Sequence, residues 1–222
     1  MKNKTFTHKF IELPKIEEEM IDGKRFYKTP QNNLYPSVTT VLSSMSKEGI
    51  EEWKNRVGEE EAARVLKKAN ERGTLIHHMA EQYLLNCAIT PNMTFLQLKP
   101  YLDRIDNVYG LEVPLYSDYL QIAGRTDCIA DYEGKPSIID FKTSRRIKEK
   151  DNILSYFLQA SCYSYMFEER TGIRIPQIAI LIVDDYGGTI PHIEKRSNYK
   201  EQLLHVITNF RQSVKNSWFS GI

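Results

Sequence analysis

One apolar run near the C-terminal end of the chain limits its fold more than any other feature. Residues Ile178-Ala179-Ile180-Leu181-Ile182-Val183 form an uninterrupted apolar run. A strand with one solvated face alternates apolar and polar side chains, whereas a strand buried on both faces is apolar throughout. The run therefore predicts a central strand over 176–183, in a sheet that helices cover on both faces.

Helical periodicity predicts several helices before and after this strand. We expect a short helix capped by Ser37, and a pair of helices over 48–69 and 74–85 that Gly73 separates. An amphipathic segment follows and ends at Gly110. Its apolar stripe comprises Leu98, Leu102, Ile105 and Val108. Two further helices are expected over 151–170, with Gly172 as its C-terminal cap, and over 198–217.

The remaining segments predict an α/β protein with a mixed sheet. Strands are expected over 111–116, 120–132, 137–141 and 190–195, and a short hairpin near Gly23. A chain of 222 residues suits one domain. Within it we expect four parts: an N-terminal extension (1–35), a helical part (36–110), a sheet core (111–195) and a C-terminal helix (196–222).

The charge balance is almost neutral, with 30 basic and 29 acidic residues. Proteins that wrap nucleic acid are usually more basic, so only local charge favours such a partner. Residues 142–150 hold five basic residues and one acidic residue. No apolar run approaches the roughly 18 residues that span a bilayer. Residues 1–10 lack the apolar segment of a secretory signal. We therefore expect a cytoplasmic protein with no membrane partner.

The three cysteines, Cys87, Cys128 and Cys162, are far apart and form no C-x-x-C. This pattern argues against a disulfide framework and against a cysteine-rich metal site. We expect all three in the interior as small apolar residues.

A predicted hairpin carries the residues with the clearest chemistry. Its turn is expected at Glu133-Gly134. If the strands pair symmetrically about that turn, Asp127 faces Asp140. Because side chains alternate along a strand, Asp140 and Lys142 share one face. The pairing thus brings two carboxylates and one ammonium group together.

Such a cluster is unfavourable for stability alone, because like charges opposite each other across two strands are destabilising. A divalent cation between the carboxylates would resolve the conflict, and oxygen ligands suit Mg²⁺ or Mn²⁺. The metal would acidify a water and neutralise a phosphoryl oxygen, while Lys142 would orient or help deprotonate the water and stabilise developing charge. The predicted reaction is phosphodiester hydrolysis. The alternative is a structural ion-pair cluster in which Lys142 bridges the aspartates.

Two helical pairs add candidates. His77 and Glu81 are four residues apart and share a helix face, as do Gln159 and Tyr163. Each has an ordinary structural explanation, since a lone helical histidine is usually structural and a tyrosine among aromatic residues is usually core.

Taken in chain order, these motifs resemble the RecB-like branch of the PD-(D/E)XK nucleases. The matching motifs are Gly73-Thr74 with His77 and Glu81, Gly124-Arg125-Thr126-Asp127, Asp140-Phe141-Lys142-Thr143, and Gln159 with Tyr163. Pro36-Ser37-Val38-Thr39-Thr40 and residues 53–62 resemble the mitochondrial genome maintenance exonuclease group and its bacteriophage relatives. The resemblance covers about residues 35–185.

The resemblance implies a restriction-endonuclease-like core in the order α-β-β-β-α-β, with an N-terminal helical elaboration. It also implies that Asp127, Asp140 and Lys142 are catalytic, and that His77 joins the two aspartates at the metal. Supporting or DNA-binding roles are expected for the remaining candidates: Glu81, Glu112, Arg125, Thr143, Arg145, Arg146, Gln159 and Tyr163. Members that carry an iron–sulfur cluster use four cysteines, and this chain has three.

The implied activity is that of a Mg²⁺- or Mn²⁺-dependent exonuclease acting on single-stranded DNA with free ends. Its setting would be phage or bacterial DNA replication, recombination or degradation, in the host cytoplasm if the chain is phage-encoded. Replication or recombination proteins are candidate partners. The alternatives are an endonuclease of the same fold, a catalytically silent DNA-binding or assembly protein, and a phosphodiesterase acting on RNA or a small nucleotide. The intact Asp127, Asp140 and Lys142 argue against a silent relative.

Basic residues suggest two walls of a channel for the DNA backbone. One set lies in the helical part and comprises Lys54, Arg56, Lys67, Lys68 and Arg72; the other follows the catalytic strand and comprises Arg145, Arg146, Lys148 and Lys150. The alternative is that these side chains lie on solvated helix and loop faces.

Overall fold

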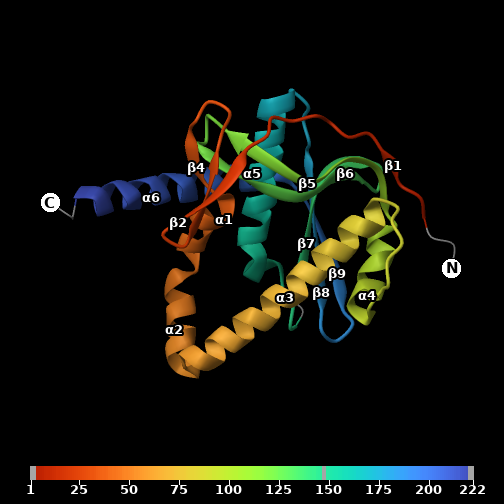
Figure 1. Cartoon of the computed structure of the whole chain (residues 1–222), viewed down its shortest axis with the longest axis horizontal. Coiled ribbons are helices and arrows are strands. Elements are labelled where there is room, and N and C mark those ends of the chain that lie inside the picture. Colours follow the sequence, from red (N-terminus) through yellow and green to blue (C-terminus); the bar gives the residue numbers. More distant parts are fainter. Residues whose placement is uncertain (1–3, 147–148, 220–222) are drawn as a thin grey trace.

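The computed structural model describes residues 4–146 and 149–219, and its centre is a mixed sheet of six strands (Figure 1). In order across the sheet the strands are β1 (Thr7–His8), β5 (Ile105–Ser117), β6 (Ile122–Tyr132), β7 (Lys135–Ser144), β8 (Gln177–Asp184) and β9 (Thr189–Lys195). The pairs β1–β5 and β7–β8 are parallel, and the other neighbours are antiparallel. The α/β class and the α-β-β-β-α-β order are therefore confirmed.

The apolar run that forms β8 is buried on both faces, as predicted. Ile178, Ile180 and Ile182 belong to one hydrophobic cluster. Ala179, Leu181 and Val183 belong to a second cluster on the opposite face. Two cores, one on each side of the sheet, remove both faces of the strand from water.

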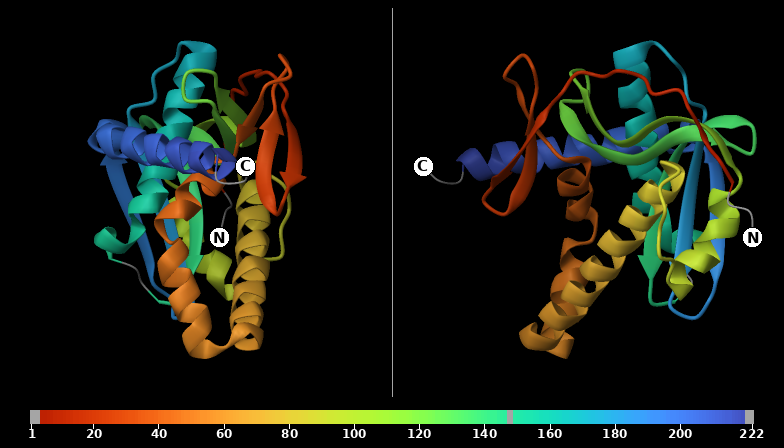
Figure 2. Two further views of the ribbon diagram at one scale, coloured as in Figure 1. Left: turned by 90° about the vertical axis from the view of Figure 1, so that its left-hand side faces the viewer. Right: turned by 45° about the vertical axis from the view of Figure 1, so that its right-hand side comes forward.

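The described residues form six α-helices, five of which contribute residues to the two cores (Figure 2). They are α1 (Val38–Leu42), α2 (Lys47–Val57), α3 (Glu59–Leu84), α4 (Met93–Leu102), α5 (Leu154–Thr171) and α6 (Lys200–Phe219). Helix α2 extends away from the sheet beside α3. Residues of α3 and α4 belong to one core, and residues of α1, α5 and α6 belong to the other. The side chain of Ser37 caps α1 as predicted, and Gly172 ends α5 in the left-handed conformation. No described helix is both long and apolar enough to cross a membrane.

The predicted division of the long helical region is wrong. The helix breaks at Gly58, between α2 and α3, and continues through Gly73. Gly58 has φ +86°, a backbone conformation that glycine adopts far more readily than other residues. Gly73 lies where α3 approaches the sheet, and a Cβ there would lie 3.8 Å from Thr143 Oγ1. The glycine at 73 therefore serves helix-to-sheet packing and does not end a helix.

The predicted stripe from Leu98 to Val108 combines two elements. Helix α4 ends at Leu102, and β5 begins at Ile105, so the expected boundary at 110/111 between the helical part and the sheet core falls inside a strand. All four apolar residues of the stripe are buried in one core. The helix-like spacing of these four residues arises because α4 and β5 bury their apolar side chains in the same core, and not because the four residues share one helix. Register shifts on both sides of Val108 place a bulge there.

The N-terminal extension is more ordered than its polar sequence suggests. Beside β1 it forms a second, three-stranded sheet: β2 (Glu17–Ile21), β3 (Lys24–Lys28) and β4 (Leu34–Pro36). The hairpin near Gly23 is confirmed, with Asp22 and Gly23 at φ +49° and +71°. Tyr27 is almost fully buried against Tyr35, Tyr116 and Ala123, which docks the small sheet onto β5 and β6.

The β6–β7 hairpin has the predicted register. Tyr132 faces Lys135, and pairing continues to Cys128 opposite Ile139. The turn residues Glu133 and Gly134 both have positive φ, as a two-residue hairpin of this type requires. Regular pairing stops one residue before Asp127 and Asp140 would meet, so the strands separate where the carboxylates lie.

The prediction for the cysteines is correct at two positions. Cys128 and Cys162 are fully buried, and Cys87, which follows α3, is exposed.

Candidate active site

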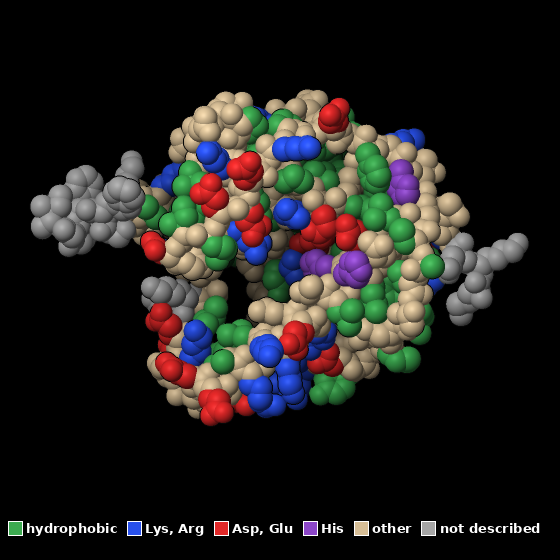
Figure 3. Space-filling view, in the orientation of Figure 1, with side chains coloured by type: hydrophobic (Ala, Val, Ile, Leu, Met, Phe, Trp, Pro, Cys, Tyr) green, Lys and Arg blue, Asp and Glu red, His purple; other side chains and the backbone are tan. Residues whose placement is uncertain are grey.

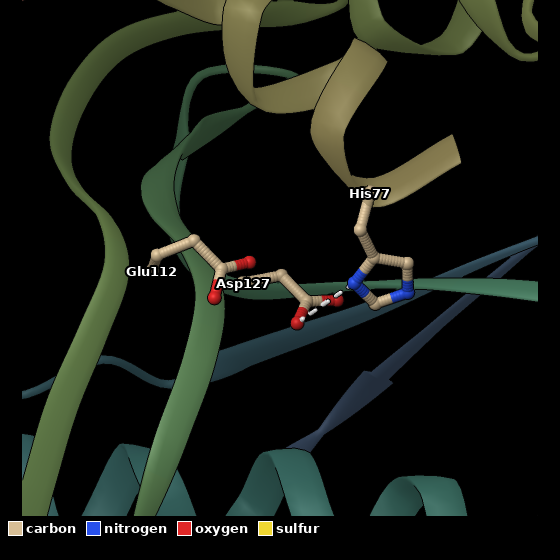
Figure 4. A group of neighbouring side chains, drawn as sticks. All are labelled: His77, Glu112 and Asp127. Atoms are coloured by element: carbon tan, nitrogen blue, oxygen red, sulfur yellow. Dashed lines mark ion pairs between the residues drawn. The ribbon is translucent and has the colours of Figure 1, made fainter. Parts of the chain in front are cut away.

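Three side chains from three elements meet at the point where the strands separate. His77 from α3, Glu112 from β5 and Asp127 from β6 offer ligand atoms that all lie within 4.8 Å of one another (Figure 4). His77 Nδ1 is 3.4 Å from Asp127 Oδ1. A helix and two strands thus contribute one nitrogen and two carboxylate donors to a single point.

The backbone of Glu112 departs from strand geometry. Its φ is +48°, in the left-handed region, although it lies within β5. A non-glycine residue there costs of the order of 1 kcal/mol or more, and such strain is concentrated at functional sites. The conformation directs the carboxylate towards Asp127 and His77 (Figure 4). From the sequence Glu112 is predicted only as a supporting residue, because an isolated glutamate in a strand gives no sign of its backbone angle.

Asp127 also links the two strands through its second oxygen. The backbone N–H of Phe141 donates a 2.8 Å hydrogen bond to Asp127 Oδ2. This bond replaces the backbone pairing that ends at Cys128. Asp127 is therefore oriented by β7 on one side and by His77 on the other.

Asp140 and Lys142 share a face of β7, as predicted. Lys142 Nζ lies 2.5 Å from Asp140 Oδ2, with the carboxylate 1% exposed and the ammonium side chain 18% exposed. Oδ2 of Asp140 is thus paired with Lys142, whereas the buried Oδ1 has no donor among the described residues. A buried carboxylate with unsatisfied oxygens is costly unless a cation completes its surroundings.

The electrostatics of the cluster follow from burial and from like charge. Burial, and then the neighbouring charge of Asp127, raise the pKa of Glu112 to about 7. Burial raises the pKa of Asp140 to about 6 even though Lys142 opposes the shift. Burial alone would also raise the pKa of Asp127, but His77 and Lys142 hold it below the ordinary value. The negative charge of Asp127 thus contributes to the raised pKa of both Glu112 and Asp140.

These residues fit a divalent cation. The donors are carboxylate oxygens and an imidazole nitrogen, a set that suits Mg²⁺ or Mn²⁺. The unpartnered, buried Oδ1 of Asp140 and the close approach of Glu112 to Asp127 are both features that a cation would stabilise. Asp140 is outside the three-residue cluster but adjoins it electrostatically through Asp127.

The Gln159–Tyr163 pair on α5 forms part of the wall of the site. Gln159 Nε2 is 3.2 Å from Tyr163 Oη. The Tyr163 ring fills the space over Gly124, which has no side chain to obstruct it. Both residues line a pocket of about 220 Å³ together with Asp127 and Lys142. The shared pocket explains why a glycine precedes Asp127 by three residues and why the tyrosine follows on α5.

A wider groove of about 820 Å³ adjoins the pocket. Residues of α3, including His77, His78 and Glu81, line one part of it. Glu112 of β5 and Arg125 of β6 also line it. Figure 3 shows this face hollowed, with acidic, basic and histidine side chains gathered around the hollow. Glu81 belongs to the wall of the groove, and its Oε2 is 3.9 Å from His78 Nδ1.

The other predicted residues lie further away. Thr143 contacts α3 near Gly73, on the face of β7 opposite Lys142. Arg145 and Arg146 are exposed beyond the end of β7 and line neither the pocket nor the groove.

The expected basic walls are only partly available. Arg72 is paired with Asp185, Lys67 with Glu71 and Lys150 with Glu194, while Lys148 lies outside the described residues. Four pocket residues were not predicted at all: Arg25, Tyr27, Ser37 and Thr39. The stretch Pro36-Ser37-Val38-Thr39-Thr40 contains two of them, whereas no motif pointed to Arg25 or Tyr27.

The sequence profile of the PD-(D/E)XK nuclease superfamily matches residues 93–218, a span that runs from α4 to α6. The chain belongs to this superfamily. The PD-(D/E)XK assignment agrees with the mixed sheet and with the Asp127, Asp140 and Lys142 arrangement on β6 and β7.

Two curated proteins are similar to this PD-(D/E)XK nuclease. Mitochondrial genome maintenance exonuclease 1 of Homo sapiens is 27% identical over 84% of this chain and 61% of the relative. The Mus musculus protein of the same name is 30% identical over 84% of this chain and 62% of the relative. The chain thus spans about three fifths of the length of both relatives. A solved structure titled "Crystal structure of SSO0001" aligns with a TM-score of 0.42 at 14% identity, covering 73% of this chain and 69% of that chain.

Proposed function

We propose that this chain is a metal-dependent deoxyribonuclease that removes nucleotides from the free ends of single-stranded DNA. The observation that carries the proposal is the arrangement about Asp127. His77 and Glu112 lie on one side of it, and the Asp140–Lys142 pair lies on the neighbouring strand. A group of acids around one half-buried lysine is costly for stability, and it is suited to phosphodiester hydrolysis.

We assign the metal to His77, Glu112, Asp127 and Asp140. When bound, Mg²⁺ or Mn²⁺ would neutralise charge on a phosphoryl oxygen and make a water more acidic. The chain's own groups prepare the site: the Phe141 N–H orients Asp127, and Lys142 compensates the charge of Asp140.

Lys142 acts as a cation in this proposal. Burial alone would lower its pKa, but Asp140 and Asp127 outweigh burial and raise the pKa above the ordinary value. The ammonium group therefore keeps its protons near neutral pH, orients the attacking water and stabilises the negative charge that develops on the phosphate. Gln159 and Tyr163 hold the wall of the pocket against which the scissile nucleotide lies.

The preference for single-stranded ends rests on two supports. Both similar curated proteins are named as exonucleases. The pocket of about 220 Å³ is small for a ligand site, which suits one unpaired nucleotide better than paired duplex. The biological setting we propose is phage or bacterial DNA replication, recombination or degradation in the cytoplasm, with replication or recombination proteins as partners.

The test compares end-labelled linear single-stranded DNA with closed circular single-stranded DNA, each incubated with Mg²⁺, Mn²⁺ or EDTA. Lys142→Ala is the inactive control. We expect metal-dependent loss of the linear substrate alone, and no loss with the variant.

Other outcomes identify the alternatives. Cleavage of the circle would show an endonuclease of the same fold. Binding of DNA without cleavage under any metal would show a DNA-binding or assembly protein. Cleavage of RNA in preference to DNA would move the substrate to RNA.

A further inference from the structure

The small N-terminal sheet reaches the candidate active site through Arg25. Four residues line both the pocket and the groove: Arg25, Arg125, His77 and Glu112. Two of these are metal-ligand candidates, and the other two are arginines. The two arginines therefore border the opening between the groove and the pocket, from β3 on one side and from β6 on the other.

The backbone of Arg25 is held in place by the start of α1. The Ser37 N–H donates a 2.8 Å hydrogen bond to the Arg25 carbonyl. Thr40 Oγ1 donates a second bond of 3.1 Å to the same carbonyl. Ser37 also forms a bridge with Ala123, two residues before Arg125. The Pro36–Thr40 stretch thus fixes the small sheet beside β6.

The two guanidinium groups have few partners of their own. Arg25 Nε is 3.2 Å from Glu18 Oε1, in a pair whose side chains are 48% and 38% exposed. Such exposed pairs contribute little to stability. Within residues 4–146 and 149–219, the guanidinium group of Arg125 forms no ion pair or hydrogen bond, and the side chain is exposed. Guanidinium groups without strong partners, carried on strands that are fixed beside the site, are available to a ligand.

We propose that Arg25 is a substrate-binding residue that, with Arg125, binds the DNA phosphate next to the one being cut. Guanidinium groups bind phosphate through paired hydrogen bonds, and phosphates repeat along a strand that enters the pocket from the groove. Ser37 and Thr40 are positioning residues that act through the Arg25 backbone. The inference rests on the proposed function, since it assumes a single strand in the groove.

The test measures binding of a fluorescein-labelled oligodeoxythymidylate by anisotropy, in Mg²⁺. Full-length protein carrying Lys142→Ala is used so that the DNA stays intact. Arg25→Gln is added to this background, and Lys24→Gln is the matched control. Lys24 is an exposed neighbour on the same strand that lines neither the pocket nor the groove.

We expect Arg25→Gln to weaken binding about tenfold and to reduce the slope of log affinity against log salt by about 0.7, the value for one phosphate contact on a single strand. Lys24→Gln should change neither quantity beyond a small general charge effect. Equal effects of the two variants, or no effect of Arg25→Gln, would overturn the inference. So would a failure of the parent protein to bind the oligonucleotide.

Thr40→Val tests the positioning role, because it removes the hydroxyl and keeps the shape. We expect weaker binding in the Arg25 protein and no further loss in the Arg25→Gln protein. An equal loss of DNA affinity in the Arg25 protein and in the Arg25→Gln protein would mean that Thr40 acts only on stability and not through Arg25. That result would overturn the positioning role. Cleavage by the wild-type protein is assayed separately, so an inactive wild type would refute the proposed nuclease without deciding the binding result.

Discussion

The ring of Tyr163 occupies the space where a side chain on Gly124 would lie. A Cβ at Gly124 would be 2.8 Å from Tyr163 Cε1 and 3.0 Å from Tyr163 Oη. We expect Gly124→Ala to lower the free energy of unfolding by about 1–3 kcal/mol, since buried overpacking must displace the ring or the strand. Because Asp127 lies three residues further along β6, cleavage should fall as well.

Urea unfolding measures the first effect, with Gly49→Ala as control because nothing lies within 4 Å of a Cβ at Gly49. A Tyr163→Ala change should remove most of the additional cost of Gly124→Ala. If the two substitutions are additive, the contact is not the cause.

Glu112 is expected to be a metal ligand whose backbone strain reduces stability. Glu112→Gln should weaken binding of Mn²⁺ by at least roughly tenfold in titration calorimetry. Glu71→Gln, at an exposed position on α3, is the control. Glu112→Gly should weaken metal binding too, while raising or preserving the unfolding free energy, because glycine tolerates φ +48°. Unchanged Mn²⁺ affinity in both variants would remove Glu112 from the metal site.

His192 on β9 should make the protein sensitive to mild acid. Burial, and then the charge of Lys150, lower the pKa of His192 below 6.5, and its Nε2 is buried without a hydrogen bond. A depressed folded-state pKa gives stability that is present above pH 6.5 and is lost as the pH falls towards the folded pKa. His192→Leu should remove this loss. The measurement is urea unfolding at several pH values between 5 and 8. If the free energy of unfolding depends on pH in the same way in the wild-type and His192→Leu proteins, His192 is not the cause.

The three cysteines should differ sharply in reactivity. Burial raises the pKa of Cys162 to about 12 and that of Cys128 well above its ordinary value, whereas Cys87 is exposed. We expect a thiol reagent such as DTNB to modify one cysteine in the native protein and three after denaturation. Cys87→Ser should abolish the native reaction. Modification of Cys128 or Cys162 without unfolding would show that the cores open more readily than the packing indicates.

Local patterns predicted the central strands of the sheet and the chemistry on its hairpin. The apolar run of β8 predicted burial on both faces, and the two-residue turn at Glu133-Gly134 predicted the register that brings Asp127 towards Asp140. Both follow from short-range rules: alternation along a strand and the geometry of a tight turn. A local rule gave a wrong prediction at Gly73, where a helix end was expected. The glycine is instead explained by the packing of α3 against the sheet.

Only the tertiary structure decided which distant side chains complete the site. The left-handed backbone of Glu112, the approach of His77 to Asp127 and the arrival of Arg25 from the N-terminal sheet depend on contacts between elements far apart in the chain. Such contacts leave no periodic signal, because a single polar residue in a strand or loop looks the same whether it faces solvent or a catalytic centre. The sequence by itself determined the central strands, the hairpin and the Asp–Lys pair. Packing between the small sheet, α3 and β5 determined the rest of the pocket.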